Sequence, residues 1–542
     1  MAPIDARSEL ETHQVENQPP PAGPYDPWEA DPVLRFWARV CGADQDALAT
    51  YGRELGTDAL SDAARDANRM PPELVAFDRA GRRIDEVRFH PGYHAQLSAG
   101  LSAGYAALPW EAAPGGHATH AAMVYMISGV DPGAACPMTM TYAAVPALTG
   151  QGPLAEAWAA KLISRRYDPA VAPLSAKSGA TLGMAMTEKQ GGSDVRANAT
   201  RAEHGPDGWR LTGHKWFCSA PMSDGFLTLA QTDAGLTCFL VPRWLEDGTR
   251  NRIHLMRLKE KLGNRSNASA EIEYHGALAY PIGAPGDGVR RIIRMVHHTR
   301  LDTAMAPAGL MGAALGAALR WAQSRKVFQR CLIDQPLMAQ VLADLALEVE
   351  GTAALAFRVA EAFDAGADDF ARPAVALAKY VANKRAPAMI AEAMECLGGM
   401  GYTDDTPMPL FYREAPLNGI WEGSGNVICL DVLRTLGRSE AAQAAIKDAM
   451  ARVRGSDRRF DGALEAFEAR WPGLPEQAEA RYHVETLALL LTAATLIEHA
   501  RPGVADAYVG ARLVGARAFS VGATPGLPAN VILSPFLDSG AV

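Results

Sequence analysis

A single carboxylate stands in a glycine-rich turn at a place where proton abstraction could occur. Residues 420–426 read Ile-Trp-Glu-Gly-Ser-Gly-Asn, and the apolar stretch 427–430 follows directly. A helix that begins there would point free backbone N–H groups toward the turn, which suits a phosphate or an electron-rich ring. Glu422 beside a flat cofactor could then remove a proton α to a carbonyl. Taken alone, a Gly-Ser-Gly before a helix is more often an ordinary N-cap.

Two further glycine-rich segments change that interpretation. Residues 183–194 read Gly-Met-Ala-Met-Thr-Glu-Lys-Gln-Gly-Gly-Ser-Asp, so the backbone can approach a ligand while Thr187 and Ser193 offer hydroxyls. Residues 395–402 read Glu-Cys-Leu-Gly-Gly-Met-Gly-Tyr and end a helical pattern over 386–397. Neither segment has the spacing of a P-loop or of a GxGxxG dinucleotide motif, which excludes those two nucleotide-binding classes.

In this order and at this separation, the three segments resemble the acyl-CoA dehydrogenase family. The resemblance is closer to one branch of it, the alkylation-response flavoproteins of the AidB type. The phrases that carry the closer match lie at residues 72–74, 87–91, 186–195, 213–217 and 261–268. The resemblance extends from about residue 50 to about residue 440, and more loosely beyond.

Length and composition describe a protein that can bury a large core. The chain has 542 residues, of which 48% are apolar and 21% charged, and this length should divide into three or four units. The net charge of −9 argues against a general polyanion binder. Seven scattered cysteines without a CxxC pair indicate reduced thiols and no metal site.

The sequence predicts a cytoplasmic protein. Residues 1–30 are acidic and proline-rich, without the apolar core of a signal peptide, and read as a flexible arm. The longest uncharged run, residues 132–155, would be interrupted as a helix by Pro137, Pro146 and Pro153, which disfavours a membrane span.

The patterns predict a mainly α chain with a central β-domain. Long helical stretches are expected over 302–329, 338–365 and 372–397, and Asp-Ala-Gly at 233–235 indicates a β-hairpin. The resemblance implies the family's two helical domains around a β-barrel-like domain, followed here by an extra helical extension. The expected boundaries give residues 1–180 as arm and helical domain, 181–290 as β-domain, 291–438 as helical bundle and 439–542 as extension. Within the extension, residues 443–454 and 485–500 read as helices, whereas 522–528 cannot be one helix.

The resemblance implies FAD as cofactor, an acyl-CoA substrate and a homotetramer. Glu422 is the expected catalytic base, and a neighbouring subunit is expected to complete each FAD site. The residues expected to bind the cofactor are Met184, Met186, Thr187, Gly192 and Ser193 of the loop, Trp216, Cys218 and Ser219 of a strand, Arg325, Phe328 and Gln335 of the arm that reaches the neighbour, Gly398 and Gly399, and Trp421, Gly423, Ser424 and Asn426 of the Glu422 turn.

Several positions depart from the family pattern. Gln329 stands where glycine is usual, and Glu395 stands where glutamine is frequent, which puts a diphosphate contact there in doubt. The resemblance nominates Arg300, in Thr-Arg-Leu-Asp at the head of a helix, as a substrate contact, although Asp302 adds negative charge nearby. Arg434, twelve residues after Glu422, is a second substrate candidate.

A DNA-binding protective flavoprotein with little turnover is the alternative function, and a flavin-bound scaffold is a third. The AidB-type branch is associated with protection of DNA from alkylation, with contact to double-stranded DNA ascribed to the extension. Residues 441–542 hold ten Lys and Arg against eleven Asp and Glu, a net charge of −1. Phosphate-driven binding requires a surplus of cations, so only the locally basic stretch 452–459 supports this interpretation.

Overall fold

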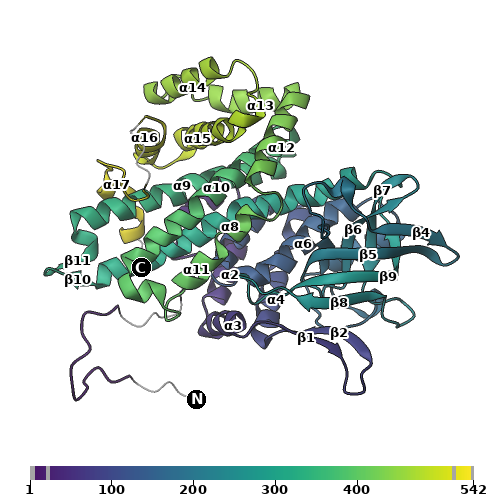
Figure 1. Ribbon diagram of the computed structural model, residues 1–542. Coiled ribbons are helices and arrows are strands. Elements are labelled where there is room, and N and C mark those ends of the chain that lie inside the picture. The colour runs from purple at the N-terminus through teal and green to yellow at the C-terminus, as the bar shows by residue number, and fades with distance from the viewer. Residues whose placement is uncertain (1–5, 20–24, 515–519, 539–542) are drawn as a thin grey trace.

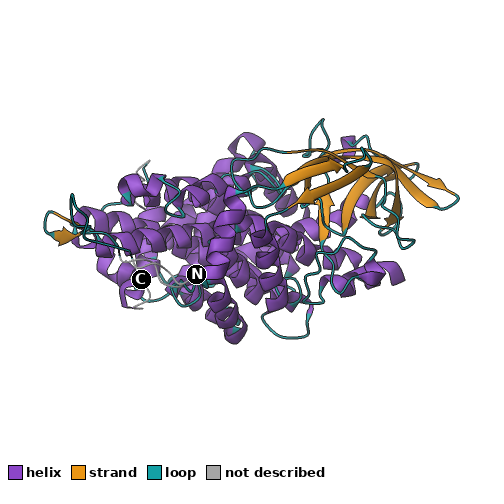
Figure 2. Cartoon of the chain, turned by 90° about the horizontal axis from the view of Figure 1, so that it is seen from below, coloured by secondary structure: helices purple, strands orange, loops and turns teal. Residues whose placement is uncertain are grey.

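The fold is described from a computed structural model that places residues 6–19, 25–514 and 520–538. A long helical body occupies most of the molecule, and a twisted sheet stands at one end of it (Figures 1 and 2). The fold is thus mainly α with a central β-barrel domain and a helical C-terminal region, as the sequence predicted. The domain boundaries at residues 180, 290 and 438 stay predictions.

The N-terminal region consists of short helices with one β-hairpin among them. The hairpin pairs β1 with β2 in antiparallel register, Glu73 opposite Arg88, and the sequence patterns, which indicated a mostly helical region over 31–180, had not revealed it. Each strand has only five or six residues, so the alternation of apolar and polar residues is too short to be detected in the sequence. The elements are α1 (Pro32–Val40), α2 (Gln45–Leu55), α3 (Asp58–Arg69), β1 (Glu73–Phe77), β2 (Arg83–Arg88), α4 (Pro91–Ala103), α5 (Gly116–Ser128), α6 (Pro132–Leu148) and α7 (Pro153–Leu162).

Helix α6 runs through two prolines. The expectation that Pro137 and Pro146 interrupt this uncharged stretch is wrong, since both lie inside the continuous helix. Each proline removes only one backbone hydrogen bond. Packing of α6 against α8 (Gly288–Ser324) and α4 supplies the stabilisation that propensity lacks. Within the described residues, no helix is long and apolar enough to cross a bilayer.

The β-domain is a seven-stranded sheet that closes on itself. Its strands run in the order β3-β6-β4-β5-β9-β7, with β8 beside β9, and a β6–β7 pairing completes the ring. The expected hairpin at residues 233–235 is confirmed, because β6 and β7 pair across it from Gly225–Pro242 to Thr232–Gly235. The strands are β3 (Leu182–Ala185), β4 (Arg201–Gly205), β5 (Gly208–Ser219), β6 (Gly225–Thr232), β7 (Gly235–Pro242), β8 (Ile253–Leu258) and β9 (Ser269–Pro281).

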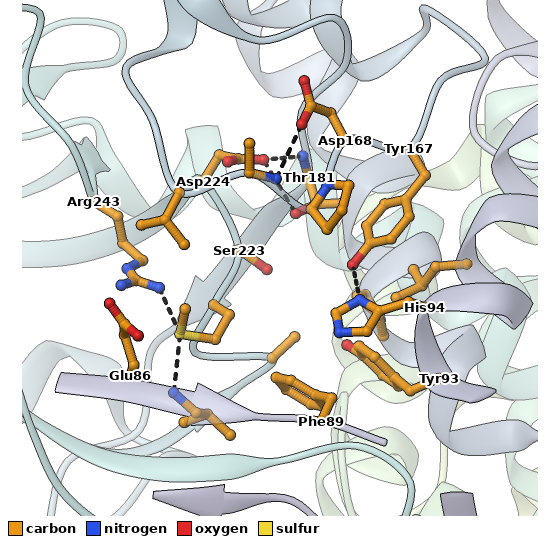
Figure 3. A pocket seen from close by; sticks show the side chains of 18 of the residues that line it. Glu86, Phe89, Tyr93, His94, Tyr167, Asp168, Thr181, Ser223, Asp224 and Arg243 are labelled. Carbon is orange, nitrogen blue, oxygen red and sulfur yellow. Dashed lines mark hydrogen bonds between the residues drawn. The ribbon is translucent and has the colours of Figure 1, made fainter. Parts of the chain in front are cut away.

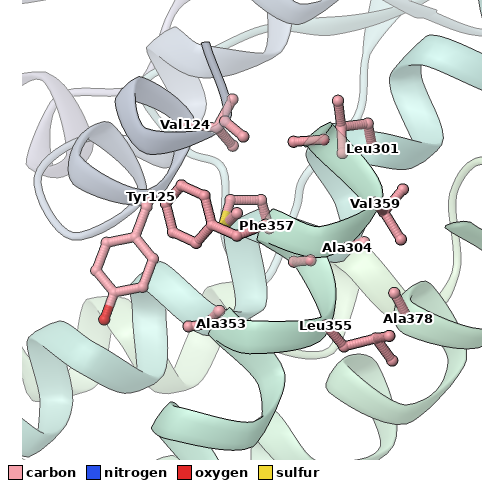
Figure 4. Packing of buried hydrophobic residues seen from close by; sticks show 14 of the residues in the cluster. Val124, Tyr125, Leu301, Ala304, Ala353, Leu355, Phe357, Val359 and Ala378 are labelled. Atoms are coloured by element: carbon pink, nitrogen blue, oxygen red, sulfur yellow. The ribbon is translucent and has the colours of Figure 1, made fainter. Parts of the chain in front are cut away.

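Three long helices form the spine of the helical body. They are α8, α9 (Pro336–Asp364) and α10 (Asp368–Cys396), and each packs on the other two. Small residues let them approach closely, and Figure 4 shows Ala304, Ala353 and Ala378 among larger side chains in their common core. The bundle continues through α11 (Met408–Glu414) and α12 (Gly425–Arg438).

Helix α8 differs at both ends from the predicted stretch 302–329. It begins at Gly288, so Thr299 and Arg300 lie well inside the helix and not at its head. It ends at Ser324, where Arg325 becomes extended and starts the hairpin of β10 (Lys326–Val327) and β11 (Arg330–Cys331). Phe328 and Gln329 form the hairpin turn with φ of 50° and 68°. These two successive left-handed residues close the turn, and neither is the glycine that such a turn prefers.

The extension adds a second layer of helices over the bundle. Its main helix α15 (Ala480–His499) packs on α9, α10 and α12, and the other elements are α13 (Glu440–Ala451), α14 (Arg458–Arg470), α16 (Val504–Val509) and α17 (Ala529–Asp538). The expected helices at 443–454 and 485–500 correspond to α13 and α15. Residues 522–528 are non-helical, as expected. The proline-rich stretch 18–24 is described only at residues 18 and 19.

The close approach of α5 to α8 gives a test of this packing. A Cβ added at Gly309 would lie 2.2 Å from the backbone oxygen of Tyr125, whereas one added at Gly316 of the same helix would meet nothing nearer than 3.4 Å. We therefore expect Gly309→Ala to lower the unfolding free energy by about 1–3 kcal/mol through overpacking. Gly316→Ala should be neutral or stabilising by up to about 1 kcal/mol from helix propensity. Thermal and chemical denaturation of both variants measures the difference, and equal midpoints would contradict the close contact between the helices.

Candidate active site

The Glu422 side chain is held inside the molecule by the turn that precedes α12. The backbone reverses through Glu422 at φ 57° and Gly423 at φ 106°. The Thr299 hydroxyl, from the middle of α8, donates a hydrogen bond to Glu422 Oε2 at 2.6 Å. A left-handed glutamate is uncommon and costs about 1–2 kcal/mol, so other contacts must hold this conformation.

Two buried cations hold the backbone of this turn. The Lys379 ammonium, from α10, donates to the carbonyl oxygens of Asn418 at 2.8 Å and Gly423 at 3.1 Å. Arg300 Nε donates to the Glu422 carbonyl oxygen at 3.2 Å. The turn is therefore clamped from α8 and from α10, and Glu422 is fixed between these helices.

Burial is the largest influence on the pKa values of Glu422 and Lys379. Loss of water raises the pKa of Glu422, while the Thr299 hydrogen bond and the positive charges of Lys379 and Arg300 oppose the rise. Burial also lowers the pKa of Lys379 to about 7, against the attraction of Glu422. A carboxyl whose pKa is raised toward the working pH is the form of base that proton abstraction favours.

Asp302 does not face this turn. Its carboxylate pairs with His120 Nε2 at 2.7 Å and accepts hydrogen bonds from Thr139 at 2.5 Å and Tyr105 at 3.3 Å. The Asp302 carboxylate is thus hydrogen-bonded on the side of α5 and α6, while its charge still contributes to the raised pKa of Glu422.

The loop at residues 183–194 is anchored by a fully buried ion pair. Glu188 Oε1 lies 2.8 Å from the Lys215 ammonium, and neither side chain has any exposed surface. The same carboxylate accepts the backbone N–H groups of Ala199 at 2.6 Å and Thr200 at 3.2 Å. This charge and these hydrogen bonds lower the pKa of Glu188 to about 2, against the effect of burial.

The loop and strand β5 form one wall. The Trp216 N–H donates to the Thr187 carbonyl oxygen at 2.7 Å, which joins the loop to the strand. Only a glycine fits at position 192, because a Cβ there would lie 2.3 Å from the Thr187 hydroxyl. Half-buried Met184, Met186 and Trp216 stand along this wall, and Lys259 Nζ lies 3.3 Å from the centre of the Trp216 ring.

The Cys136 thiol interacts with Ser219 of this wall and is influenced by the charge of Glu422. This buried thiol, on α6, has a pKa raised to about 12 by burial, while a hydrogen bond from Ser219 lowers it and the charge of Glu422 raises it. Ser219, at the end of β5, also lies 3.2 Å from the Ser269 hydroxyl. The thiol is thus influenced both by the Ser219 hydroxyl of strand β5 and by the charge of Glu422.

An arginine-rich cavity of about 760 Å³ opens beside the turn. Asp431 lies in its wall and pairs with Arg300 at 2.6 Å and with Arg372 at 2.8 Å, which links the cavity to the Glu422 turn. Arg434 stands at the same wall with its side chain mostly exposed, 3.9 Å from Asp431. The arginines that line the cavity are Arg196, Arg290, Arg372, Arg434 and Arg438, against Asp287 and Asp431.

Comparison with known proteins identifies the family. A model of the AidB N-terminal domain matches residues 17–169, and models of the acyl-CoA dehydrogenase middle and C-terminal domains match residues 183–277 and 286–437. The chain is 44% identical to AidB of Escherichia coli (strain K12), over 92% of this chain and 94% of that protein. The chain belongs to the acyl-CoA dehydrogenase family.

Other relatives agree in sequence and in fold. Acyl-CoA dehydrogenase family member 11 of Caenorhabditis elegans is 30% identical over 92% of this chain and 88% of its own. The crystal structure of Caenorhabditis elegans ACDH-11 in complex with C11-CoA superposes with a TM-score of 0.82 at 28% identity, covering 95% of each chain. Members of the family are flavoproteins, typically FAD-dependent, and the chain is an oxidoreductase of this acyl-CoA dehydrogenase-like class.

The residues expected to bind the cofactor fall into two groups that one subunit keeps apart. Gly398 lies just beyond the end of α10 and 19 residues after Lys379. A separation of 19 residues corresponds to about 28 Å along a helix. Arg325 lies 25 residues after Arg300, about 37 Å along α8. The β10–β11 hairpin stands at the end of the body opposite the sheet (Figure 1).

In the distant group, Phe328, Gly398 and Gly399 are exposed, whereas Arg325 and Gln335 are partly buried. Phe328 is 90% exposed at the tip of the hairpin, and Gln335 donates to the Val327 carbonyl oxygen at 3.0 Å. Arg325 Nη1 donates to the backbone oxygen of Asn17 in the N-terminal arm. The backbone of Gly398 and Gly399 is open, since a Cβ on either would meet no described atom within 4 Å.

Three other expected cofactor residues have partners of their own. Trp421 Nε1 donates to Asn418 Oδ1 at 2.9 Å, and Asn426 Oδ1 accepts from Arg481 of the extension at 2.8 Å. Cys218 is buried in the core of the β-domain. Among the residues placed in the structure, no group of three or more His, Cys, Asp or Glu could hold a metal ion, and all seven cysteines are free.

Sequence reasoning missed three groups that hold the site: Lys379, Glu188 and Lys215. A lysine inside an otherwise apolar helical stretch was the available signal for Lys379. Glu188 and Lys215 are 27 residues apart, and nothing in their local sequence indicates that they meet.

The Glu188–Lys215 pair predicts a pH-dependent stability. The folded-state pKa of Glu188 is depressed to about 2, so its contribution is fully present above the unfolded-state value near 4.5 and is lost as pH falls from there toward 2. We expect Glu188→Gln to cost about 3–5 kcal/mol at neutral pH, because Lys215 is then buried without an anion.

Urea unfolding at pH 7 and pH 3 measures this, with exposed Glu203→Gln in strand β4 as the matched control. Adding Lys215→Met to Glu188→Gln should recover part of the loss, since it removes the unpaired charge. A single variant as stable as the control would contradict the role given to the ion pair.

Proposed function

We propose that the chain is an FAD-dependent acyl-CoA dehydrogenase in which Glu422 removes the α-proton of the acyl thioester. The observation that supports this most directly is the Glu422 carboxylate, partly buried, with a pKa raised by desolvation and a hydrogen bond from Thr299 that fixes its position. A carboxylate so placed would accept a proton at one fixed point.

The residues present fit a flavin ring at the wall formed by the loop at residues 183–194 and strand β5. Trp216, Met184 and Met186 offer flat or polarisable surface, and Thr187 and Ser219 offer hydroxyls to ring heteroatoms. The glycine at 192 keeps the loop close enough to Thr187 to leave that surface clear. When bound, FAD supplies the acceptor for the hydride from the β-carbon of the substrate.

The protein's own contribution is to orient and tune the base. Glu422 must be ionised to take the proton, and burial raises its pKa, so reactivity should decline as pH falls below that raised value. The Thr299 hydroxyl and the Lys379 and Arg300 charges oppose this rise in pKa and so favour the ionised carboxylate. Arg300 acts through the backbone of the turn, because its guanidinium is engaged by the Glu422 carbonyl oxygen and by Asp431.

The arginine-rich cavity beside the turn supports a CoA ester as substrate. Five arginines against two aspartates leave a positive wall, and guanidinium groups match phosphate geometry. We assign Arg434, which is mostly exposed at this wall, to the phosphate end of the substrate. Arg300, in contrast, serves the thioester end indirectly.

A second subunit is proposed to complete the cofactor site. Arg325, Phe328 and Gln335 on one side, and Glu422 with the β5 wall on the other, are too far apart to reach one FAD in a single chain. Phe328 is a bulky side chain with positive φ and 90% exposure, an uncommon and costly state that contact with a neighbour would explain. This supports a homotetramer, the usual assembly of the family, in which each hairpin reaches the neighbour's FAD.

We do not extend the proposal to duplex DNA or to the alkylation response. In the locally basic stretch of the extension, Arg452 pairs with Glu498 at 3.2 Å, Arg454 with Glu468 at 3.1 Å and Arg459 with two aspartates. These arginines are already paired with carboxylates, so they leave little surplus positive charge to bind the phosphates of DNA.

Replacing the base tests the proposal. The FAD-loaded protein is mixed anaerobically with acyl-CoAs of several chain lengths. The flavin absorbance at about 450 nm should then decrease. Glu422→Gln should slow bleaching by about 10²–10⁴-fold with FAD content unchanged, because general-base catalysis contributes about that much. Exposed Glu440→Gln in α13 is the control. Bleaching of Glu422→Gln at the wild-type rate would reject the assignment.

The Thr299 hydrogen bond predicts a directional pH effect. Thr299→Val removes a donor that stabilises ionised Glu422, so the pKa of Glu422 rises further and the acid limb of the bleaching rate moves to higher pH. Thr303→Val is the matched control, since this hydroxyl on the next turn of α8 donates to the Arg300 carbonyl oxygen and not to Glu422. An acid limb that stays in place, or moves to lower pH, would show that Thr299 does not stabilise the ionised base.

The hairpin tip predicts a coupled loss of assembly and cofactor. Phe328→Ala should weaken FAD binding and shift the protein toward smaller assemblies while leaving the folding of each chain unchanged, because the side chain touches so little of its own subunit. Light scattering and FAD fluorescence titration measure both. Phe77→Ala, another exposed aromatic in the β1–β2 hairpin, is the control. Unchanged mass and unchanged FAD affinity together would refute the shared site.

A further inference from the structure

A separate cavity of about 410 Å³ lies between the N-terminal helical region and the β-domain. Its lining comes from the end of β2 and the residue after it (86–89), α4, Pro137 of α6, the segment at residues 167–171, residues 177 and 181, the turn at 220–224 after strand β5, and residues 243–244 after strand β7. Figure 3 shows the side chains converging on a common space. The proposed catalytic turn contributes no residue to this lining, so the cavity is distinct from the site around Glu422. Interfaces between folded units are frequent places for small-molecule sites.

Arg243 is the unusual residue of this cavity. Its side chain is only 7% exposed, and among the residues placed in the structure no carboxylate lies within 4.0 Å of its guanidinium. Its side-chain hydrogen bond goes instead to the Met222 sulfur at 2.7 Å. The Val87 backbone N–H points at the same sulfur from 3.3 Å. A thioether is a weak acceptor, so a buried cation and a backbone donor share a partner that satisfies neither well.

Two further donors at the cavity lack a partner. Ser223 is 3% exposed, and its hydroxyl has no hydrogen-bond partner among the described residues. The same holds, within the described part of the chain, for the indole N–H of Trp244. Buried polar groups normally find partners, so an excess of donors around one cavity indicates an acceptor that binds there.

The acidic residues of the cavity are already engaged. Asp224 pairs with Lys177 at 2.9 Å and accepts the Thr181 N–H at 2.8 Å. Asp168 accepts the Ser178 N–H at 2.9 Å. Glu86 pairs with Arg250 at 3.2 Å, outside the lining. The charges of Asp224, Glu86 and Asp85 attract Arg243 from a distance, but within the described residues none of them forms an ion pair with it. A monoanionic ligand in the cavity would supply a direct partner.

The opposite wall is aromatic. Phe89 and Tyr93 stack with ring centres 4.2 Å apart. His94 and Tyr167 stack less closely, at 5.8 Å, and are joined by a hydrogen bond of 2.6 Å. In Figure 3 these four rings face the side of the cavity that holds Arg243 and Ser223. A flat apolar group would lie against them with favourable ring contacts.

We propose that this cavity binds a small aromatic carboxylate, with its carboxylate toward Arg243 and Ser223 and its ring against Phe89 and Tyr93. The cavity is too small for an entire CoA ester, so this ligand is chemically separate from the proposed substrate. Because the turn at 220–224 follows Ser219 directly, the ligand would lie behind the wall assigned to the flavin.

The probe for this proposal is 2-naphthoate, whose own fluorescence reports binding to the purified FAD-loaded protein. We expect saturable binding that a non-cleavable acyl-CoA analogue does not displace, and much weaker binding of the neutral 2-naphthalenemethanol. Arg243→Met should weaken 2-naphthoate by about tenfold or more, the loss of one charge-assisted hydrogen bond. Exposed Arg201→Met in strand β4 is the matched control and should bind as the wild type does.

A second variant guards against misfolding of Arg243→Met. Val171 lies on the cavity rim with 40% of its surface exposed, so Val171→Trp should fill the space without disturbing the core. It should abolish 2-naphthoate binding while FAD content and bleaching by acyl-CoA stay unchanged. No binding to the wild type, wild-type affinity in both the Arg243 and the Val171 variants, or displacement by the acyl-CoA analogue would each overturn the proposal.

Discussion

The candidate site depends on keeping one carboxylate out of water without letting the turn that carries it relax. Glu422 sits in a left-handed conformation that an isolated chain would avoid, and its burial opposes ionisation. Lys379 and Arg300 counter both tendencies, since they bond the carbonyl oxygens of the turn and place positive charge near the carboxylate. These cations come from two different helices. The chemistry at residue 422 therefore exists only while α8 and α10 stay packed.

That requirement explains the small residues of the bundle. Close approach of α8 to α5 and α10 needs glycine and alanine at the contact, as at Gly309, where an added Cβ would meet the Tyr125 backbone. The same two long helices also set the spacing of the molecule. They hold the Glu422 turn near the β-domain and the β10–β11 hairpin at the far end (Figure 1). A long rigid spine suits an assembly in which one subunit contributes to its neighbour's site, because the distances stay fixed.

The β-domain adds a different kind of constraint. Its loop at residues 183–194 is rich in glycine and would be mobile if it relied on local contacts. The Glu188–Lys215 pair fixes it from beneath, and the Trp216 N–H ties it to strand β5. After strand β7, Arg243 forms no such ion pair among the described residues and is attracted by Asp224, Glu86 and Asp85 only from a distance. The contrast between a cation that the fold neutralises and one that it leaves open is what distinguishes a structural pair from a ligand site.

The sequence by itself determined the family-like order of helices, sheet and bundle, the hairpin at residues 233–235, and the Glu422 turn before α12. Local patterns suffice for these, because periodicity, turn residues and contiguous motifs lie within a few positions of one another. Only the tertiary structure decided that Thr299, Lys379 and Arg300 meet Glu422, that Asp302 turns away to His120, and that Arg325 and Glu422 are far apart. Those outcomes depend on which faces of long helices pack together. Residues so far apart along the chain give no local sequence signal that they are in contact.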